Sequence, residues 1–292
     1  MACTDPNYAL QLPSGIVRLV PRSIEELRRG ELETGATALL LPCGSCLGCR
    51  KSRAREWAYR CSLELQQHRE ATFLTLTYDE LHVPPTLSKR HLQLFWKRLR
   101  RDWPAKSIRY FSCGEYGTKT ARPHYHAIVF GIDPDRVGFF IDAWRDGRDQ
   151  PMGFVDARPV NPARIAYTAG YVSKKIGWRE SRDLRVDPST GEEYKYQPPF
   201  ILMSRRPGLG KAAALQHPNS FRLQAIYDGS PIPVPRFLHS HWVSQASDAQ
   251  KLKLKEDKLL LPTTDISSRA LRASALIHAS QQSLAAAKRT KL

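Results

Sequence analysis

The sequence is poor in long apolar segments and begins without a targeting pattern. In its first residues, MACTDPNYALQLPSG, no basic region precedes an apolar stretch, so we expect no secretory signal. No apolar run approaches the roughly 18 residues that a membrane span needs. We therefore expect a soluble, intracellular protein that does not enter a membrane. In a reducing compartment its 6 cysteines are free thiols or metal ligands rather than disulfides.

Acidic residues are also scarce relative to basic ones. The chain has 45 Lys and Arg against 28 Asp and Glu, which gives a formal net charge of +17. This balance is typical of a protein that binds a phosphate backbone, although a solvated basic surface or a ribosome- or membrane-associated protein would also fit. With 292 residues and 41% hydrophobic content, the chain can bury a core as one large domain, or as a domain with appendages.

Hydrophobic periodicity predicts alternating strands and helices in the middle of the chain. Apolar residues at helical spacing predict helices over 50–68, 88–101 and 137–147. Runs of β-branched and aromatic residues predict strands over 72–78, 108–116, 124–131 and 153–160. The last strand belongs at a sheet edge because it contains Pro159. Asn161 as cap and Pro162 in the first turn predict a further helix to about Ile176.

The resulting fold class is α+β. The order is β-α-β-β-α-β with one added helix, a split antiparallel sheet covered by helices on one face and open to a ligand on the other. We predict an N-terminal segment over 1–69 with a Cys-rich turn and a basic helix, a core over 70–180, and a basic C-terminal extension over 181–292. In residues 1–42 we predict only a short helix around 23–29.

One predicted strand carries a histidine pair. His124 and His126 flank a single residue, so both imidazoles point from the same face and can converge on one cation. If the hairpin loop before them centres on residues 119 and 120, antiparallel pairing places Glu115 directly across from His124. Two nitrogen ligands and one oxygen ligand suit Mg²⁺ or Mn²⁺, and His ligation favours Mn²⁺ in affinity. The alternative is a cross-strand ion pair between Glu115 and Arg122 or Lys119.

Two tyrosines lie one turn apart on the last predicted helix. Tyr167 and Tyr171 lie opposite the apolar stripe of that helix and close to Lys174 and Lys175. A tyrosine hydroxyl has a pKa near 10, so nearby positive charge is needed to favour the phenolate that attacks phosphorus. Either lysine could supply that charge, while a cation polarises the phosphate. The alternative is that the tyrosines pack against a neighbouring loop.

The motifs FLTLTY, CGEYG, RPHYHAIVFG and YTAGYVSKK occur in this order in the chain. Together they resemble the HUH endonuclease superfamily, and within it the replication initiators of gokushovirus-type microviruses, small phages with circular single-stranded DNA. PCGSCLGCRKSRAREWAYRC and MSRRPGLG resemble the same group, so the resemblance covers about residues 42–211. Relaxases of this superfamily place their tyrosine before the His pair. Here the tyrosines follow it, which favours a replication initiator.

The resemblance implies a metal-dependent endonuclease with an HUH-type, RRM-like sheet. His124 and His126 would be metal ligands with Glu115 as the third, and Tyr167 and Tyr171 would be paired nucleophiles. The enzyme would nick origin DNA, forming a 5′-phosphotyrosine link and a free 3′ hydroxyl, and rejoin strands in rolling-circle replication. Its partners would be single-stranded and circular double-stranded origin DNA with a host helicase and polymerase, in the cytoplasm of a bacterial host.

A cysteine cluster precedes the basic helix. Cys43, Cys46 and Cys49 form C-x2-C-x2-C, and Cys61 is available as a fourth thiolate for structural Zn²⁺. If 50–68 is helical, however, Cys61 lies roughly 18 Å from Cys49 by helical rise, so free cysteines in a nucleic-acid-binding turn remain an alternative. The basic residues of the helix are candidate contacts to the DNA backbone: Arg50, Lys51, Arg53, Arg55 and Arg60.

Two other functions remain open. An RRM-type module would hold single-stranded nucleic acid on the same fold without chemistry, which explains the charge and the sheet but not the convergence of Glu115 with the two histidines. A transposase or a plasmid replication initiator would use the same chemistry on another element.

Overall fold

The computed structural model describes residues 3–21, 23–105, 107–177, 184–186, 191–217 and 224–260. The chain divides into two compact units. The larger unit is Arg53–Lys251, and the smaller one combines residues 1–52 with 252–292. The predicted boundaries at 69 and 180 stay predictions. Within the described part of the chain, no helix combines the length and the apolar content that crossing a membrane requires.

The larger unit is built on a five-stranded sheet of order β10-β5-β6-β4-β7, in which all neighbours are antiparallel. The strands are β4 (Ala71–Thr77), β5 (Arg109–Tyr116), β6 (Pro123–Phe130), β7 (Val155–Pro159) and β10 (Phe200–Met203). The first four match the predicted strands, and β7 lies at the edge as Pro159 indicated. β10 was not predicted and adds a strand from beyond residue 180 to the other edge.

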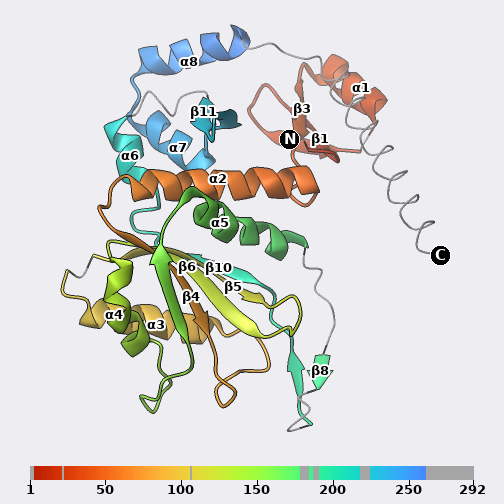
Figure 1. Ribbon diagram of the computed structural model, residues 1–292. Helices are drawn as coiled ribbons and strands as arrows, with labels where there is room; N and C mark the ends of the chain where they lie inside the picture. Colours follow the sequence, from red (N-terminus) through yellow and green to blue (C-terminus); the bar gives the residue numbers. More distant parts are fainter. Residues whose placement is uncertain are drawn as a thin grey trace. The chain divides into compact units, whose positions relative to one another are not determined.

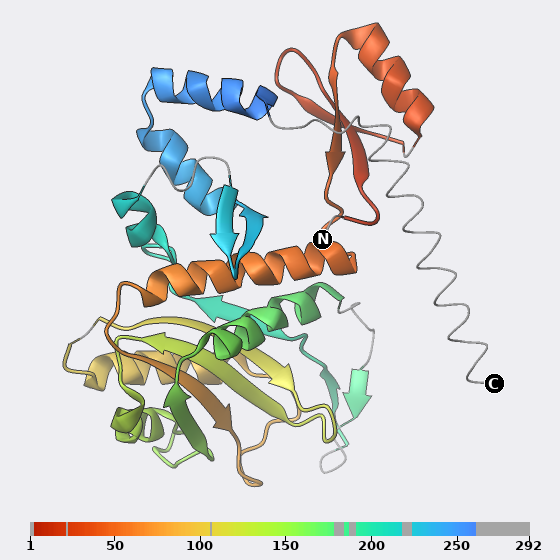
Figure 2. The same cartoon turned by 45° about the horizontal axis from the view of Figure 1, so that its top comes forward.

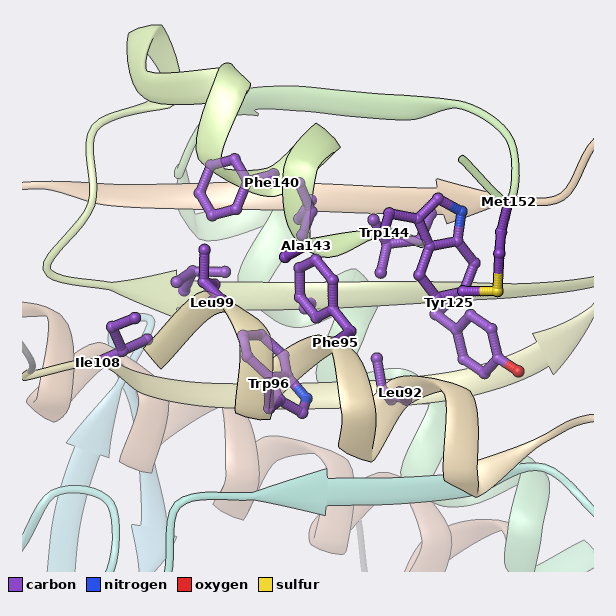
Figure 3. Packing of buried hydrophobic residues seen from close by; sticks show 14 of the residues in the cluster. Leu92, Phe95, Trp96, Leu99, Ile108, Tyr125, Phe140, Ala143, Trp144 and Met152 are labelled. Carbon is purple, nitrogen blue, oxygen red and sulfur yellow. The ribbon is translucent and has the colours of Figure 1, made fainter. Parts of the chain in front are cut away.

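Two predicted helices cover one face of this sheet. They are α3 (Lys89–Asp102), capped by Ser88, and α4 (Val137–Ala143), which follows the short 3-10 helix Pro134–Arg136. The stripe predicted for α3 is buried, and with Tyr125 and Trp144 it forms the main core. Figure 3 shows Phe95 and Trp96 of α3 beside Trp144 and Phe140 in this core. The α+β class and its antiparallel sheet are therefore confirmed.

The opposite face is not open along its whole length, which corrects one expectation. Helices α2 (Leu47–Leu65) and α5 (Pro162–Gly177) lie over it, as Figure 1 and Figure 2 show. A second core forms there from Ala58 and Cys61 of α2, sheet residues including Phe111 and Ile128, and the apolar stripe of α5. Because this core fills one part of the face, only the end of the face near the β5–β6 hairpin remains for polar groups.

The remaining elements follow the sheet in the sequence. Two short antiparallel pairs are β8 (Leu184–Val186) with β9 (Glu193–Lys195) and β11 (Gln224–Tyr227) with β12 (Ser230–Pro233). The helices are α6 (Lys211–Gln216), α7 (Arg236–Gln245) and α8 (Asp248–Leu260). A third small core joins α2, α6 and α7 through residues such as Leu63, Ala213 and Leu238.

The smaller unit has more regular structure than residues 1–42 indicated. It contains a three-stranded antiparallel sheet, order β2-β1-β3, and the helix α1 (Ile24–Thr34), which extends the predicted short helix. The strands are β1 (Asn7–Gln11), β2 (Val17–Val20) and β3 (Thr37–Leu41). Its buried core is small and consists of Leu10, Leu27, Ala36 and Ala38. The strands are too short and too irregular in pattern for periodicity to detect.

Candidate metal and tyrosine site

The β5–β6 hairpin brings the predicted metal ligands together. The register pairs Glu115 with His124, as the predicted loop centre required. Glu115 Oε1 lies 3.0 Å from His124 Nε2 and 3.2 Å from His126 Nε2. The ligand atoms of all three residues lie within 4.8 Å of one another. The carboxylate is buried, and His124 retains the most exposure of the three.

The outer nitrogens of both imidazoles have oxygen neighbours. His124 Nδ1 lies 3.1 Å from the Arg122 carbonyl oxygen, and His126 Nδ1 lies 3.1 Å from Thr75 Oγ1 on β4. A carbonyl can only accept, so His124 carries its proton on Nδ1 and presents the Nε2 lone pair to the shared site. Thr75 was not predicted as part of the site, because the pairing of β4 with β6 is not visible in the sequence.

Arg122 has partners other than Glu115, which disfavours the alternative ion pair between them. It pairs with Glu80 and donates to the Tyr78 carbonyl oxygen at 2.7 Å. Since Glu115 contacts both histidines, the three residues act as one polar cluster on the sheet.

The opposite side of the hairpin is held by aromatic packing and hydrogen bonds. The Tyr125 hydroxyl lies 2.8 Å from the Tyr78 hydroxyl and donates to the Ser88 carbonyl at 3.0 Å. Gly114 allows the rings of Phe200 and Tyr125 to pack closely, because a Cβ there would lie only 2.9 Å from Phe200. Tyr125 separates the two histidines in sequence, so its buried anchor fixes the strand from which both imidazoles project.

The tyrosine helix begins as predicted. The Asn161 side chain accepts a hydrogen bond from Arg164 N at 2.8 Å, and Pro162 occupies the first turn. The buried positions Ile165, Ala169 and Val172 face the second core. The helix is therefore fixed to the sheet by its apolar side.

Both tyrosines point to the histidine cluster rather than to a distant loop. The Tyr167 hydroxyl lies 3.5 Å from His126 Nε2, and the two tyrosine rings are 5.0 Å apart between centroids. The ring of Tyr171 stacks on that of His126 at 5.7 Å. The two are unequal in exposure, since Tyr167 is 50% exposed and Tyr171 only 6%.

The buried tyrosine has a perturbed hydroxyl. Burial raises the pKa of Tyr171, and hydrogen bonds with Glu115 and Tyr167 raise it further. The neutral hydroxyl is therefore favoured in the protein without a cation. Lys174 and Lys175 lie in α5, but their side chains fall outside the described residues.

Two nitrogens and one carboxylate oxygen at these separations fit a divalent cation. The lone pair of His124 Nε2 is directed to Glu115, whose carboxylate supplies the negative charge that a cation requires. Mg²⁺ and Mn²⁺ both accept such a set with open positions for phosphate oxygens, and imidazole ligation favours Mn²⁺. These residues would hold the ion.

The basic helix differs from its prediction at one residue. Arg60 is 7% exposed, with its guanidinium over the rings of Trp57 and Phe237 and its Nε donating to the Leu209 carbonyl. It stabilises the fold and cannot reach a DNA backbone. Lys51 and Arg53 are exposed.

The predicted zinc ligands are also regrouped. Cys43, Cys46 and Cys49 lie together, but their fourth neighbour is Cys3. Cys61 is fully buried in the second core, as the length of helix between it and Cys49 implied. The prediction of Cys61 as the fourth thiolate is therefore corrected. Cys3 precedes the first strand, and nothing in its spacing connects it with the other three.

Comparison with known proteins gives consistent matches. Residues 71–176 match the family model of the ORF2 type of replication-associated protein. The Replication-associated protein ORF2 of Spiroplasma virus 4 is 32% identical over 167 residues, which are 51% of this chain and 52% of that protein. The Replication-associated protein ORF4 of Chlamydia phage 1 is 33% identical over 154 residues, 47% of this chain and 38% of that protein.

A third relative aligns over more of the chain. The Replication-associated protein VP4 of Bdellovibrio phage phiMH2K is 28% identical over 250 residues, 75% of this chain and 74% of that protein. The chain thus spans about half or less of the length of the first two relatives. No solved structure matches it. The predicted resemblance is confirmed: the chain is similar to replication-associated proteins of small single-stranded DNA phages, and its family match includes the metal cluster and the tyrosine helix.

Proposed function

We propose that the chain is an origin-nicking endonuclease that initiates rolling-circle replication of a small circular DNA genome. The observation that supports this most is the Tyr167 hydroxyl, 3.5 Å from His126 Nε2 beside a carboxylate and a second imidazole. A nucleic-acid-binding module has no need of a tyrosine hydroxyl at a cation site. The similarity to replication-associated phage proteins supports the same proposal.

The reaction is a transesterification at phosphorus. The attacking tyrosine hydroxyl loses its proton, its oxygen bonds to phosphorus, and the bond from phosphorus to the 3′ oxygen breaks. That oxygen takes up a proton and leaves as a free 3′ hydroxyl, while the 5′ phosphate stays on the tyrosine. A bound Mg²⁺ or Mn²⁺ would polarise the phosphate. Because the ester retains the bond energy, the reverse reaction reseals a strand without ATP.

The surroundings of the two tyrosines assign them an order. Tyr167 is half-exposed and contacts only the edge of the cluster, so its hydroxyl is accessible to an incoming strand. Tyr171 is buried, and its hydrogen bond with Glu115 holds its proton. Tyr167 therefore acts first, and Tyr171 acts when the cluster rearranges for the second cut that ends a round. Lys174 or Lys175 supplies positive charge to the phenolate.

The DNA backbone is held by exposed basic residues of α2, chiefly Lys51, Arg53 and Arg55, with Arg50 beside them. Release of counterions from the phosphates makes such contacts sensitive to salt. A host helicase and polymerase would extend the free 3′ hydroxyl in the cytoplasm of a bacterial cell.

The test uses the full chain, Mn²⁺ and overlapping single-stranded oligonucleotides that cover the genome encoding it. An oligonucleotide labelled at its 3′ end should become covalently attached to the protein in denaturing electrophoresis. The same oligonucleotide labelled at its 5′ end should give a shorter free fragment that a polymerase can extend. We expect Tyr167→Phe to reduce adduct from the first cut more than Tyr171→Phe, and the double variant to form none.

Tyr227→Phe is the matched control, because it also removes one partly buried hydroxyl but lies on β11. His126→Ala should abolish the adduct and keep salt-sensitive DNA binding. The proposal is wrong if no oligonucleotide gives an adduct, or if the double tyrosine variant forms as much adduct as Tyr227→Phe. The order of the tyrosines is wrong if Tyr171→Phe removes the first cut and Tyr167→Phe does not.

A further inference from the structure

Four cysteines meet at one end of the small sheet, in a place that the proposed cleavage reaction does not use. β1 and β3 are antiparallel neighbours, with Asn7 paired to Leu41. Cys3 lies just before this pair and Cys43 just after it, so the two emerge from the same end of the sheet. Cys46 and Cys49 follow at the start of α2. The topology therefore joins the N-terminal strand, the turn after β3 and the first turn of α2.

The spacing of the sulfurs suits a tetrahedral metal site. The four Sγ atoms all lie within 4.8 Å of one another, and Cys46 Sγ lies 3.8 Å from Cys3 Sγ. A tetrahedron of thiolates at about 2.3 Å from Zn²⁺ has its sulfurs about 3.8 Å apart. A disulfide would bring two sulfurs to about 2.05 Å, and all of these cysteines are free.

Polar hydrogens are directed at the sulfurs. The backbone N–H of Cys43 donates to Cys3 Sγ at 3.4 Å, that of Cys46 to Cys43 Sγ at 3.3 Å, and that of Cys49 to Cys46 Sγ at 3.4 Å. Ser45 Oγ donates to Cys43 Sγ at 3.7 Å. Hydrogen bonds to the ligand atoms orient metal-bound thiolates and partly neutralise their charge. These contacts form before any ion is added, so the ligands are arranged in advance.

We propose that Cys3, Cys43, Cys46 and Cys49 bind one structural Zn²⁺. Four soft thiolates select Zn²⁺ over the harder Mg²⁺ or Mn²⁺ of the histidine site. Four protein ligands also leave no open position, which is the pattern of a structural site rather than a catalytic one. On binding, four thiols lose their protons to solvent as four Zn–S bonds form, with no change of oxidation state.

The small unit needs such an ion. Its buried core is limited to Leu10, Leu27, Ala36 and Ala38, and small cores of this kind commonly depend on a metal. The ion would tie the residue before β1 to the start of α2. It would thereby fix the turn that precedes the exposed Lys51 and Arg53, so the zinc site organises a basic segment without touching the cleavage chemistry.

The test is Co²⁺ titration of the full chain, reduced and stripped with a chelator. We expect the thiolate-to-cobalt charge-transfer bands and the visible bands of tetrahedral cobalt to saturate at one equivalent and to disappear when Zn²⁺ is added. The histidine site gives no thiolate band, and His126→Ala should leave the signal unchanged. Cys3→Ser should lose most of the charge-transfer intensity. Cys61→Ala and Cys113→Ala, which change two fully buried cysteines, should keep it.

A measurement without substitutions covers the case in which Cys3→Ser fails to fold. The wild-type chain is treated with iodoacetamide with and without Zn²⁺, and each cysteine is followed by peptide mass spectrometry. We expect Zn²⁺ to protect Cys3, Cys43, Cys46 and Cys49 together, and to leave Cys61 and Cys113 unaffected. The proposal is overturned by equal alkylation rates of the four with and without Zn²⁺, by absence of the thiolate band, or by loss of that band in Cys61→Ala.

Discussion

The buried carboxylate of Glu64 gives a stability prediction whose size follows from its contacts. Glu64 lies on α2, with its side chain 4% exposed, and pairs with Arg109 on β5. Its other oxygen accepts from Gly210 N at 2.7 Å, and His68 lies 3.4 Å away. One side chain thus joins α2, the sheet and the loop before α6. We predict that Glu64→Gln strongly destabilises the larger unit at neutral pH.

The magnitude follows from the pKa of this carboxyl group. Burial raises the pKa of Glu64, but hydrogen bonds with His68, Arg109 and Gly210 N lower it by more, to about 2 from the ordinary 4.5. At 1.4 kcal/mol per pH unit, this difference corresponds to about 3 kcal/mol of stability. Because the folded pKa is depressed, the contribution is complete above about pH 5 and is lost as pH falls towards 2.

The assay is urea unfolding of wild type and Glu64→Gln between about pH 3 and 7. Asp142→Asn is the matched control, because Asp142 pairs with Arg145 at 2.9 Å but is 65% exposed. Exposed pairs of this kind contribute about 1 kcal/mol or less. The reasoning is refuted if Glu64→Gln costs no more than Asp142→Asn at pH 7, or if the difference between wild type and Glu64→Gln stays constant as pH falls.

Two further predictions concern the site and the DNA contacts. Thr75→Val removes the oxygen beside His126 Nδ1 and should weaken Mn²⁺ binding by about tenfold or more, measured by calorimetry; unchanged affinity would show that Thr75 does not orient His126. Neutralising Lys51, Arg53 and Arg55 together should reduce the salt slope of DNA binding by about two to three units, whereas Arg60→Met should lower the unfolding midpoint. The opposite pattern would place Arg60, rather than the other three, against DNA.

The central sheet could be predicted because each of its elements has a strong local pattern. The stripe of α3 repeats at helical spacing, and Ser88 and Asn161 cap their helices as expected. β10 was missed because its pairing with β5 joins residues far apart in sequence. The open face was an error of the same kind, since the order of elements does not reveal that α2 returns over the sheet.

The metal cluster could be predicted because its ligands lie in one hairpin. A single register, fixed by the loop centre, places Glu115 opposite His124. Thr75 requires the pairing of a third strand, which no local pattern specifies. Cys3 is 40 residues from the next cysteine to which it is hydrogen-bonded, and only the pairing of β1 with β3 joins them. Arg60 was misassigned because composition records its charge but not its burial.

The tyrosine pair shows what periodicity can and cannot state about a site. Spacing of four residues places Tyr167 and Tyr171 on one side of α5, about 6 Å apart along its axis. That axial offset positions them differently over a cluster that belongs to the sheet beneath. Tyr167 reaches the rim at His126, while Tyr171 lies deeper, against Glu115. Two residues that are equivalent in the sequence therefore have unequal access to a strand. Any scheme in which they alternate requires the helix or the strand to move between cuts.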